Sequence, residues 1–578
     1  MKVLKGCLFL LIAIFSSCNN VGEKCGNSST ELDVIIQSYQ NRESFDRNEY
    51  PLGLYTREHF KAEAAYAENQ MQYFGCVVFE ELSETEKISY QLLKFVLQDK
   101  IDYYKFEQFL NPLLSDSGFH SSLNYQIRPL NNYWEVKEYL KKLNSLPEFV
   151  NQHFVNLREG LAKGVSQPKV IFKGYESTYN DHIVNDFTKS PFYKPFQNLP
   201  QSLSKTQKDS VLKVAKISIE KTVVPQFRKI KTFFETEYLP KTRTSLGVSE
   251  TPNGAAYYQN RINFYTTSTQ YTADDIHQIG LKEVARIKAE MQKIIKNLNF
   301  KGSFADFLKF LRTDEQFYAK TPKELIMIAR DMAKRADAQL PKFFKTLPRK
   351  PYGVAPVPDA IAPKYTGGRY IGTSKESTDP GYYWVNTYDL PSRTLYTLPS
   401  LTVHEAFPGH HLQGSLNNEL GDSIPQFRRD LYLSAYGEGW GLYSEFLADE
   451  MGMYTTPYEQ FGKFTYEMWR ACRLVVDTGI HAKGWTREQV VKYMSENTAL
   501  SLHEINTETD RYISWPGQAL SYKIGELKIR ELRKKAETEL KEKFDIRDFH
   551  EVILEQGTVT LAILEERVYT YINKIKDE

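Results

Sequence analysis

Three histidines and a glutamate fall within eight consecutive positions of this 578-residue chain. They are His404, Glu405, His410 and His411, and Pro408 lies between the first pair and the second. Imidazole and carboxylate groups are common ligands of zinc, and a glutamate beside a zinc ligand can act as a general base on the water that the metal activates. The stretch therefore predicts a catalytic Zn2+ site.

The spacing differs from that of the HExxH motif, in which two histidines one helical turn apart bind a single ion. The residue four positions after His404 is Pro408. On a straight helix His410 would point away from His404, and His411 would lie about 10 Å farther along the axis. Because Pro408 and Gly409 disfavour a continuous helix, we expect a bulge that brings one histidine back. We favour His410 as the second ligand and hold His411 in reserve.

Four sequence blocks, taken together and in order, resemble the family named domain of unknown function 885. The blocks are His-Glu-Ala-Phe-Pro-Gly-His-His-Leu-Gln from His404, Gly437-Glu438-Gly439-Trp440, Asp477-Thr478-Gly479-Ile480-His481 and Pro516-Gly517-Gln518-Ala519-Leu520-Ser521-Tyr522-Lys523. The resemblance runs from roughly residue 30 to the C-terminus. That family looks like a distant relative of the gluzincin zinc metallopeptidases, such as thimet oligopeptidase and Taq carboxypeptidase.

The resemblance implies roles for two glutamates around the histidines. A catalytic zinc needs a third protein ligand and an open position. Gluzincins take the third ligand from a glutamate on a following helix, which points to Glu438. Glu445 is the alternative ligand, or a partner of one of the histidines. Glu405 is then the general base that takes a proton from the zinc-bound water.

Further catalytic groups are expected in the later blocks. Asp477 and His481 lie one helical turn apart, so the pair either helps to stabilise the tetrahedral intermediate or forms a structural contact. In the related peptidases a C-terminal tyrosine points at the scissile carbonyl, which suggests Tyr522, with Tyr512 behind it. Arg511 could bind a substrate carboxylate in bidentate fashion.

The N-terminus has the pattern of a secretory signal. A basic start is followed by an apolar run from Cys7 to Phe15, which is too short to span a membrane. Phe15-Ser16-Ser17-Cys18 resembles a bacterial lipobox, with an ordinary signal peptide as the alternative. We therefore expect a signal peptide over 1–17, lipidation of Cys18 and a polar tether over 18–30. This places the protein in the bacterial cell envelope, as a periplasmic or cell-surface lipoprotein.

Composition is that of a globular protein, with 41% hydrophobic and 25% charged residues. The net charge of +2 indicates no nucleic-acid partner. At this length we expect two lobes, an N-terminal helical lobe over 31–250 and a catalytic lobe over 251–578 that holds the metal site. The fold class is mainly α, a two-lobed gluzincin-like fold with a small β-sheet beside the active-site helix.

Hydrophobic periodicity predicts helices over most of the chain. The clearest cover 84–99, 134–143, 207–238, 273–298, 303–311 and 321–339. The segment 251–267, rich in aromatic residues and threonine, is expected to be extended or in strands. The segment 381–387 is the best strand, either the edge strand that aligns a peptide substrate beside the metal helix or part of a small structural sheet.

The favoured function is that of a zinc-dependent peptidase, a hydrolase that cleaves short peptides in the cell envelope by means of a metal-activated water. Its partners are then a peptide substrate and, through the lipid anchor, a membrane. One alternative is a surface glycan-binding lipoprotein without catalysis, which would explain the 38 tyrosines and the anchor but not the histidine-rich stretch. Another is a zinc hydrolase that acts on a non-peptide amide or ester.

Overall fold

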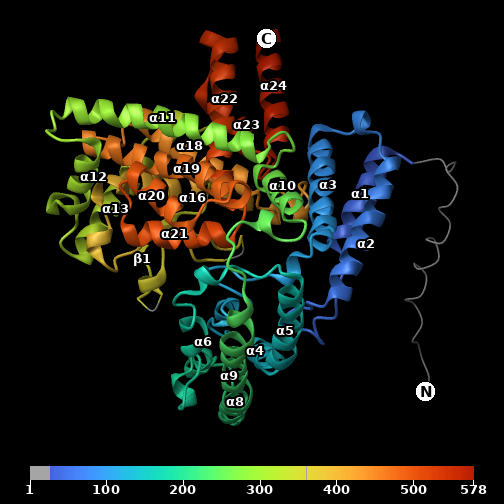
Figure 1. Cartoon of the computed structure of the whole chain (residues 1–578). Helices are drawn as coiled ribbons and strands as arrows, with labels where there is room; N and C mark the ends of the chain where they lie inside the picture. The colour runs from blue at the N-terminus through green and yellow to red at the C-terminus, as the bar shows by residue number, and fades with distance from the viewer. Residues whose placement is uncertain (1–25, 360, 376) are drawn as a thin grey trace.

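A computed structural model describes residues 26–359, 361–375 and 377–578 (Figure 1). The expected signal peptide and Cys18 lie outside these residues. The first helix, α1, spans Ser28–Gln40 and is capped by Asn27, so the last three residues of the expected tether are helical. Within the described residues, no helix combines the length and the apolar character needed to cross a membrane.

The fold is mainly helical, as the sequence predicts, with one small sheet. Helices α1, α2 (Arg57–Tyr73) and α3 (Glu84–Lys105) lie side by side at one edge of the molecule (Figure 1). Their buried side chains belong to the same hydrophobic core as those of the C-terminal helices. Those C-terminal helices are α22 (Ser521–Leu540), α23 (Ile546–Leu554) and α24 (Leu561–Asp577).

A group of shorter helices forms the lower part of the molecule in Figure 1. It comprises α4 (Tyr133–Asn144), α5 (Leu146–Lys163), α6 (Ser177–Asn180), α7 (Lys194–Gln197), α8 (Lys205–Ser218) and α9 (Val224–Phe233). A π-helical turn, Ile219–Val223, joins α8 to α9. Their core also includes side chains of α11 and α19, so buried residues from both halves of the chain meet there.

The segment 251–267 is helical, and the prediction of extended structure there is wrong. Helix α10 spans Gly254–Thr266. Tyr258 and Ile262, four residues apart, are 2% and 0% exposed. Burial on one helical face thus outweighs the β-propensity of the aromatic residues, which depends strongly on context.

The remaining helices build the body around the histidine-rich stretch. They are α11 (Ala273–Asn297), α12 (Phe304–Thr313), α13 (Pro322–Asp337), α14 (Leu340–Phe343), α15 (Leu398–Glu405), α16 (His410–Asn418), α17 (Gln426–Asp430), α18 (Ser434–Glu450), α19 (Pro457–Lys483), α20 (Arg487–Asn497) and α21 (Leu502–Ser514). The side chain of Thr272 caps the N-terminus of α11.

The sheet has the strand order β1-β3-β2, with β1 at Tyr352–Pro356, β2 at Gly368–Ile371 and β3 at Gly381–Val385. Strand β3 pairs in parallel with β1 and antiparallel with β2. The strand expected over 381–387 is thus present, but it is the central strand and not an edge. The alternation of its side chains, with Tyr383 and Val385 buried, reflects packing on one face. The edge strand beside α15, the helix that ends with His404 and Glu405, is β2.

Candidate metal centre

The helix that begins at Leu398 ends at Glu405, and a new helix begins at His410. The four residues between them form a tight bulge with a cis Phe407-Pro408 peptide bond. The bulge passes so close to α15 that a Cβ atom on Gly409 would lie 1.9 Å from the carbonyl oxygen of His404. Trp440 of α18 donates a hydrogen bond of 2.8 Å from Nε1 to the carbonyl of Pro408. The break expected at Pro408-Gly409 is therefore present.

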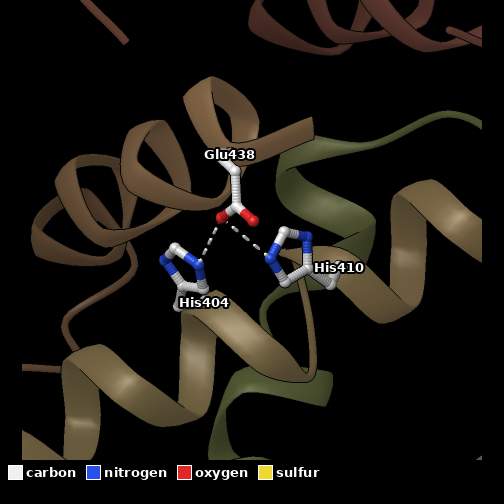
Figure 2. Close-up of side chains that lie close together, drawn as sticks. All are labelled: His404, His410 and Glu438. Atoms are coloured by element: carbon white, nitrogen blue, oxygen red, sulfur yellow. Dashed lines mark ion pairs between the residues drawn. The ribbon is translucent and has the colours of Figure 1, made fainter. Parts of the chain in front are cut away.

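Because of this bulge, His404 and His410 face one another, and Glu438 of α18 points between their rings (Figure 2). The ring centroids are 4.7 Å apart. The Nε2 atoms of both histidines lie 3.4 Å from Oε2 of Glu438. The three side chains that the sequence singled out as metal ligands thus converge on one point.

His411 turns the other way. Its ring is fully buried and packs against Tyr352 and Phe407. Its Nδ1 lies 3.1 Å from the hydroxyl of Tyr370 and 3.2 Å from that of Ser415. Burial lowers the pKa of His411 to about 4. Of the two candidates for second ligand, only His410 is placed beside His404.

Helix α18 can approach α15 closely because it carries a glycine opposite the first histidine. A Cβ atom on Gly441 would lie 2.7 Å from Cε1 of the His404 ring, closer than real contacts allow. Glu438 is one helical turn before Gly441, so the close approach also sets the position of its carboxylate. The run of glycines around Glu438 thus has a steric reason.

Glu405 is fixed by the edge strand. The backbone N–H of Tyr370 in β2 donates a hydrogen bond of 2.7 Å to Oε2 of Glu405. The carboxylate is nearly buried, at 8% exposure. It also lies near enough to His404 to favour the charged form of that ring electrostatically. A glutamate adjacent to both the ligand group and the edge strand is in the place where a general base would act.

Glu445 contacts the far side of His404. Its Oε1 lies 2.8 Å from Nδ1 of His404 and 3.6 Å from Nη2 of Arg470. Burial by itself would lower the pKa of His404, but the carboxylates of Glu438 and Glu445 outweigh it and raise that pKa to about 9. Of the two roles open to Glu445 from the sequence, the geometry is that of a partner of a histidine.

The Asp477–His481 pair is embedded in the protein interior. Nδ1 of His481 accepts a hydrogen bond from the backbone N–H of Val248, and Nε2 lies 2.9 Å from the carbonyl of Tyr512. Asp477 accepts from the hydroxyl of Tyr258 at 2.6 Å and from the N–H of Gly517. Both ring nitrogens of His481 are thus occupied by backbone groups, as in the structural role that the sequence allowed.

The polar groups of Tyr512 and Arg511 are also hydrogen-bonded within the protein. The Tyr512 hydroxyl accepts hydrogen bonds from Trp469 and Arg473, and this side chain is 1% exposed. Arg511 forms an ion pair with Glu508 and donates to Gln518 at 2.8 Å. Neither side chain has its polar group free for a substrate.

The surroundings of Tyr522 differ from those of Tyr512 and Arg511. The guanidinium of Arg473 is stacked on its ring, 4.5 Å from the centroid. Its hydroxyl makes no hydrogen bond with any described residue. Burial and the nearby carboxylate of Glu438 raise the pKa of Tyr522, and Arg473 acts in the opposite direction. Of the three later candidates, Tyr522 alone combines a free hydroxyl with proximity to the converging ligands.

Two polar side chains near the site were not expected from the sequence. Tyr432 donates a hydrogen bond of 3.2 Å to Oε1 of Glu438, which leaves Oε2 for the histidines. Arg369 of β2 forms no ion pair within the described chain. Its pKa is raised, against the effect of burial, by Tyr365 and by the carboxylates of Glu405 and Glu438. The sequence feature that could have pointed to Arg369 is the short stretch Gly367-Gly368-Arg369-Tyr370, which lies upstream of β3.

The donor set fits a zinc ion. Bonds of about 2.0–2.1 Å in tetrahedral geometry separate ligand atoms by about 3.3 Å, and the two Nε2–Oε2 distances are 3.4 Å. Two imidazoles and one carboxylate leave a fourth position open, as catalytic zinc sites do. The partner of His404 at Nδ1 fixes which ring nitrogen faces the centre.

Solved structures that match nearly the whole chain include the following two. A crystal structure of a "putative lipoprotein" from Colwellia psychrerythraea matches with a TM-score of 0.85 and 27% identity, covering 95% of this chain and 100% of that one. A "putative lipoprotein of unknown function" from Shewanella oneidensis matches with a TM-score of 0.66 and 18% identity, covering 93% and 96%. The second match shows similarity of fold alone. No curated protein matches the chain.

A protein-family model matches residues 42–568, and its range includes all three converging ligands, Glu405 and Tyr522. The chain therefore belongs to the family described as bacterial protein of unknown function, DUF885.

Proposed function

We propose that the protein is a zinc-dependent hydrolase, and specifically a peptidase related to the gluzincins in its two-lobed helical design. One observation carries the proposal: His404, His410 and Glu438 converge with the donor spacing of a zinc site, and Glu405 lies beside the first of them. A structural site would use four protein ligands, whereas three with an adjacent carboxylate is the catalytic arrangement.

When bound there, zinc would act as a Lewis acid on a carbonyl oxygen and lower the pKa of a coordinated water. Glu405 accepts the proton of the attacking water and returns it to the leaving amine. The Tyr370 N–H keeps one carboxylate oxygen of Glu405 in place, so the other oxygen is the one that exchanges the proton. Proton transfer by a positioned side chain contributes about 10²- to 10⁴-fold to rate.

The edge strand β2 supplies a surface for an extended peptide. Its partner β3 lies on one side, and the opposite side borders α15 and Glu405. A peptide that adds to a sheet edge is aligned by main-chain hydrogen bonds irrespective of its sequence. Such an alignment would bring successive peptide carbonyls past the zinc ligands, which supports a peptide substrate over a compact ester.

Tyr522 and Arg369 are the groups available to a developing oxyanion or a substrate carboxylate. The Tyr522 ring is held by Arg473, so its hydroxyl is preorganised. Arg369 lies on β2, where it carries a positive charge that no described carboxylate neutralises through an ion pair. The two side chains interact electrostatically with one another and with Glu438.

The cell envelope is the proposed location. The two structural relatives are each named "putative lipoprotein", and the lipobox-like Phe15-Ser16-Ser17-Cys18 would supply a lipidation site in this chain. Helix α1 begins ten residues after Cys18, so the anchor would hold the catalytic body close to the membrane surface.

The deciding experiment measures zinc content and peptide hydrolysis together. Wild type purified without chelator is expected to hold one zinc per chain, and His404→Ala to hold none. His503→Ala, which changes an exposed histidine of another His-Glu pair, is the matched control and should keep its zinc.

Glu405→Gln is expected to retain zinc and to lose at least about 100-fold in kcat on a peptide library. Glu551→Gln, in the pair His550-Glu551, serves as its control and should hydrolyse peptides normally. Zinc-free wild type would refute the proposal. If the protein holds stoichiometric zinc but cleaves no library peptide, the proposed substrate changes to a non-peptide amide or ester.

A further inference from the structure

A cavity of about 290 Å³ opens beside the helix that leads to the metal centre. Leu398 and Leu401 of α15 form one wall, and Thr465 and Tyr466 of α19 form another. Leu401 precedes His404 by one helical turn, about 4.5 Å along the axis. The cavity is at the lower end of the volumes that small ligands occupy, so it suits one side chain and not a folded peptide.

The cavity also borders the start of the edge strand. Gly367, which precedes β2, lies in its wall. A Cβ atom on Gly367 would be 3.9 Å from Nη1 of Arg393 and 4.0 Å from Cδ2 of Leu401. A peptide paired along β2 would therefore pass the mouth of the cavity within a few residues of the scissile bond, since each strand residue advances about 3.3 Å.

Three charged side chains line the cavity: Arg312, Arg393 and Glu504. Arg312 is committed to the protein, because it donates to the carbonyls of Thr498 and Leu500 at 2.6 and 3.1 Å. Arg393 donates to one carbonyl, that of Tyr388, and forms no ion pair with a described residue. The carboxylate of Glu504 likewise has neither an ion pair nor a hydrogen bond within the described chain.

A half-buried cation and a half-buried carboxylate that share a cavity without pairing are costly to maintain. Each is more than 4.0 Å from any oppositely charged described side chain. Burial and the nearby Glu508 raise the pKa of Glu504 to about 7, while Arg393 and two other arginines oppose the shift. A ligand that places a negative group on Arg393 and a positive group on Glu504 would satisfy both. A purely basic side chain would pair with Glu504 but be repelled by Arg393, and a purely acidic one would pair with Arg393 but be repelled by Glu504.

We propose that this cavity binds a zwitterionic side chain of the substrate, one with an ammonium and a carboxylate on the same terminal carbon, as in diaminopimelate. Glu504 binds the ammonium and Arg393 the carboxylate. The apolar wall of Leu398 and Leu401 packs against the methylene stem. This inference rests on the proposed hydrolase for its place beside a scissile bond, but the binding itself does not require catalysis.

Four residues with the same carbon stem test the assignment. Norleucine carries neither terminal charge, lysine carries the ammonium, 2-aminopimelate carries the carboxylate, and diaminopimelate carries both. Peptides that share all other positions and differ at this one are compared by kcat/KM. Diaminopimelate is expected to exceed norleucine by about 100-fold or more, because each charge-assisted hydrogen bond is worth roughly 10-fold or more.

Two variants separate the charges. Glu504→Gln should remove the preference for diaminopimelate over 2-aminopimelate, and Arg393→Gln should remove its preference over lysine. Ser392→Ala, which changes an uncharged residue of the same cavity, should leave all four ratios unchanged. Ser392→Ala should also hydrolyse the norleucine peptide at the wild-type rate.

Calorimetry with the four residues as Nα-acetyl amides, which carry no free α-ammonium or α-carboxylate group, tests binding of the side chain without turnover. Wild type should bind diaminopimelate at least about 10-fold more tightly than lysine or 2-aminopimelate, and both charge variants should lose this difference. Equal binding of diaminopimelate and norleucine overturns the assignment, even if peptides are cleaved. Selective binding of diaminopimelate without cleavage of any peptide upholds the cavity and refutes the peptidase.

Discussion

Nδ1 of His404 lies 2.8 Å from the carboxylate of Glu445, on the side of the ring opposite Glu438. The imidazole is thus held between two carboxylates of one helix, α18, seven residues apart. One of them belongs to the group of converging ligands and the other orients the ring. The position of the His404 ring therefore depends on Glu445, although the Glu445 carboxylate is not one of the three converging groups.

Replacing Glu445 by Gln should weaken zinc binding by about 10- to 100-fold, the usual effect of removing the partner of a ligating histidine. The amide keeps the size of the side chain but loses the negative charge that orients Nδ1–H toward it. Competition with a chelator gives the affinity directly. Glu450→Gln, on the same helix but paired with Arg533, is the control. Unchanged zinc affinity in Glu445→Gln would show that the contact does not orient the ring.

Gly441→Ala should displace the His404 ring, since the new Cβ would lie 2.7 Å from Cε1. We expect loss of stoichiometric zinc, although alanine favours the helix by roughly 1 kcal/mol. Gly414→Ala in α16 is the matched control, because its Cβ meets only Tyr370 at an ordinary 3.5 Å. Metal content and circular dichroism separate the two effects. A fully zinc-loaded Gly441→Ala protein would mean that α18 can shift away without cost.

Tyr522→Phe should lower kcat by about 10-fold or more without changing zinc content, because only the hydroxyl is removed and the ring still stacks on Arg473. Tyr512→Phe removes a hydroxyl that is bonded within the protein and should affect stability more than kcat. Steady-state kinetics and thermal unfolding of both variants are compared. A rise in KM at constant kcat in Tyr522→Phe would assign this hydroxyl to ground-state binding instead.

The stability that Asp477 contributes should fall as the pH rises from about 4 to 7, because burial raises the pKa of this carboxyl to about 7 while hydrogen bonds from Tyr258 and Gly517 oppose the shift. The folded state then holds a proton that the unfolded state has already released, so the stability that this proton provides is full below about pH 4 and is lost as pH rises through 7.

Asp477→Asn should remove this part of the pH dependence, which amounts to a few kcal/mol at roughly 1.4 kcal/mol per pKa unit. Urea unfolding at pH 5 and pH 8 gives the difference for wild type and variant. Asp422→Asn, an exposed control, should behave as wild type. An identical pH dependence in wild type and Asp477→Asn would contradict the assignment of the proton to this carboxyl.

The residues of the centre could be predicted from local sequence, because their chemistry and spacing are themselves the signal. His404, Glu405 and the break at Pro408 follow from residue types and backbone rules, and the third glutamate follows from the family resemblance. The choice of His410 over His411 depends on which of the two histidines the bulge places beside His404. Zinc itself and the hydrolytic reaction remain predictions.

The surroundings of the centre could not be predicted in the same way, since they depend on contacts between distant segments. The sequence left a catalytic and a structural role open for His481, and only the structure shows that its ring nitrogens are bound by backbone groups of residues 248 and 512. Arg369 and Tyr432 carry no motif. The helix at 254–266 was mistaken for extended chain because its aromatic residues fit either structure, and only the packing decides between them.

The close packing of α18 against α22 makes the support of Glu438 depend on the C-terminal end of the chain. A Cβ atom on Gly525 would lie 1.9 Å from the carbonyl of Ala435, so the two helices touch backbone to backbone just before Glu438. Helix α22 begins only at Ser521, 83 residues after Glu438. A chain truncated before Ser521 would therefore keep His404, His410 and Glu438 but would lack the helix against which α18 packs on this side.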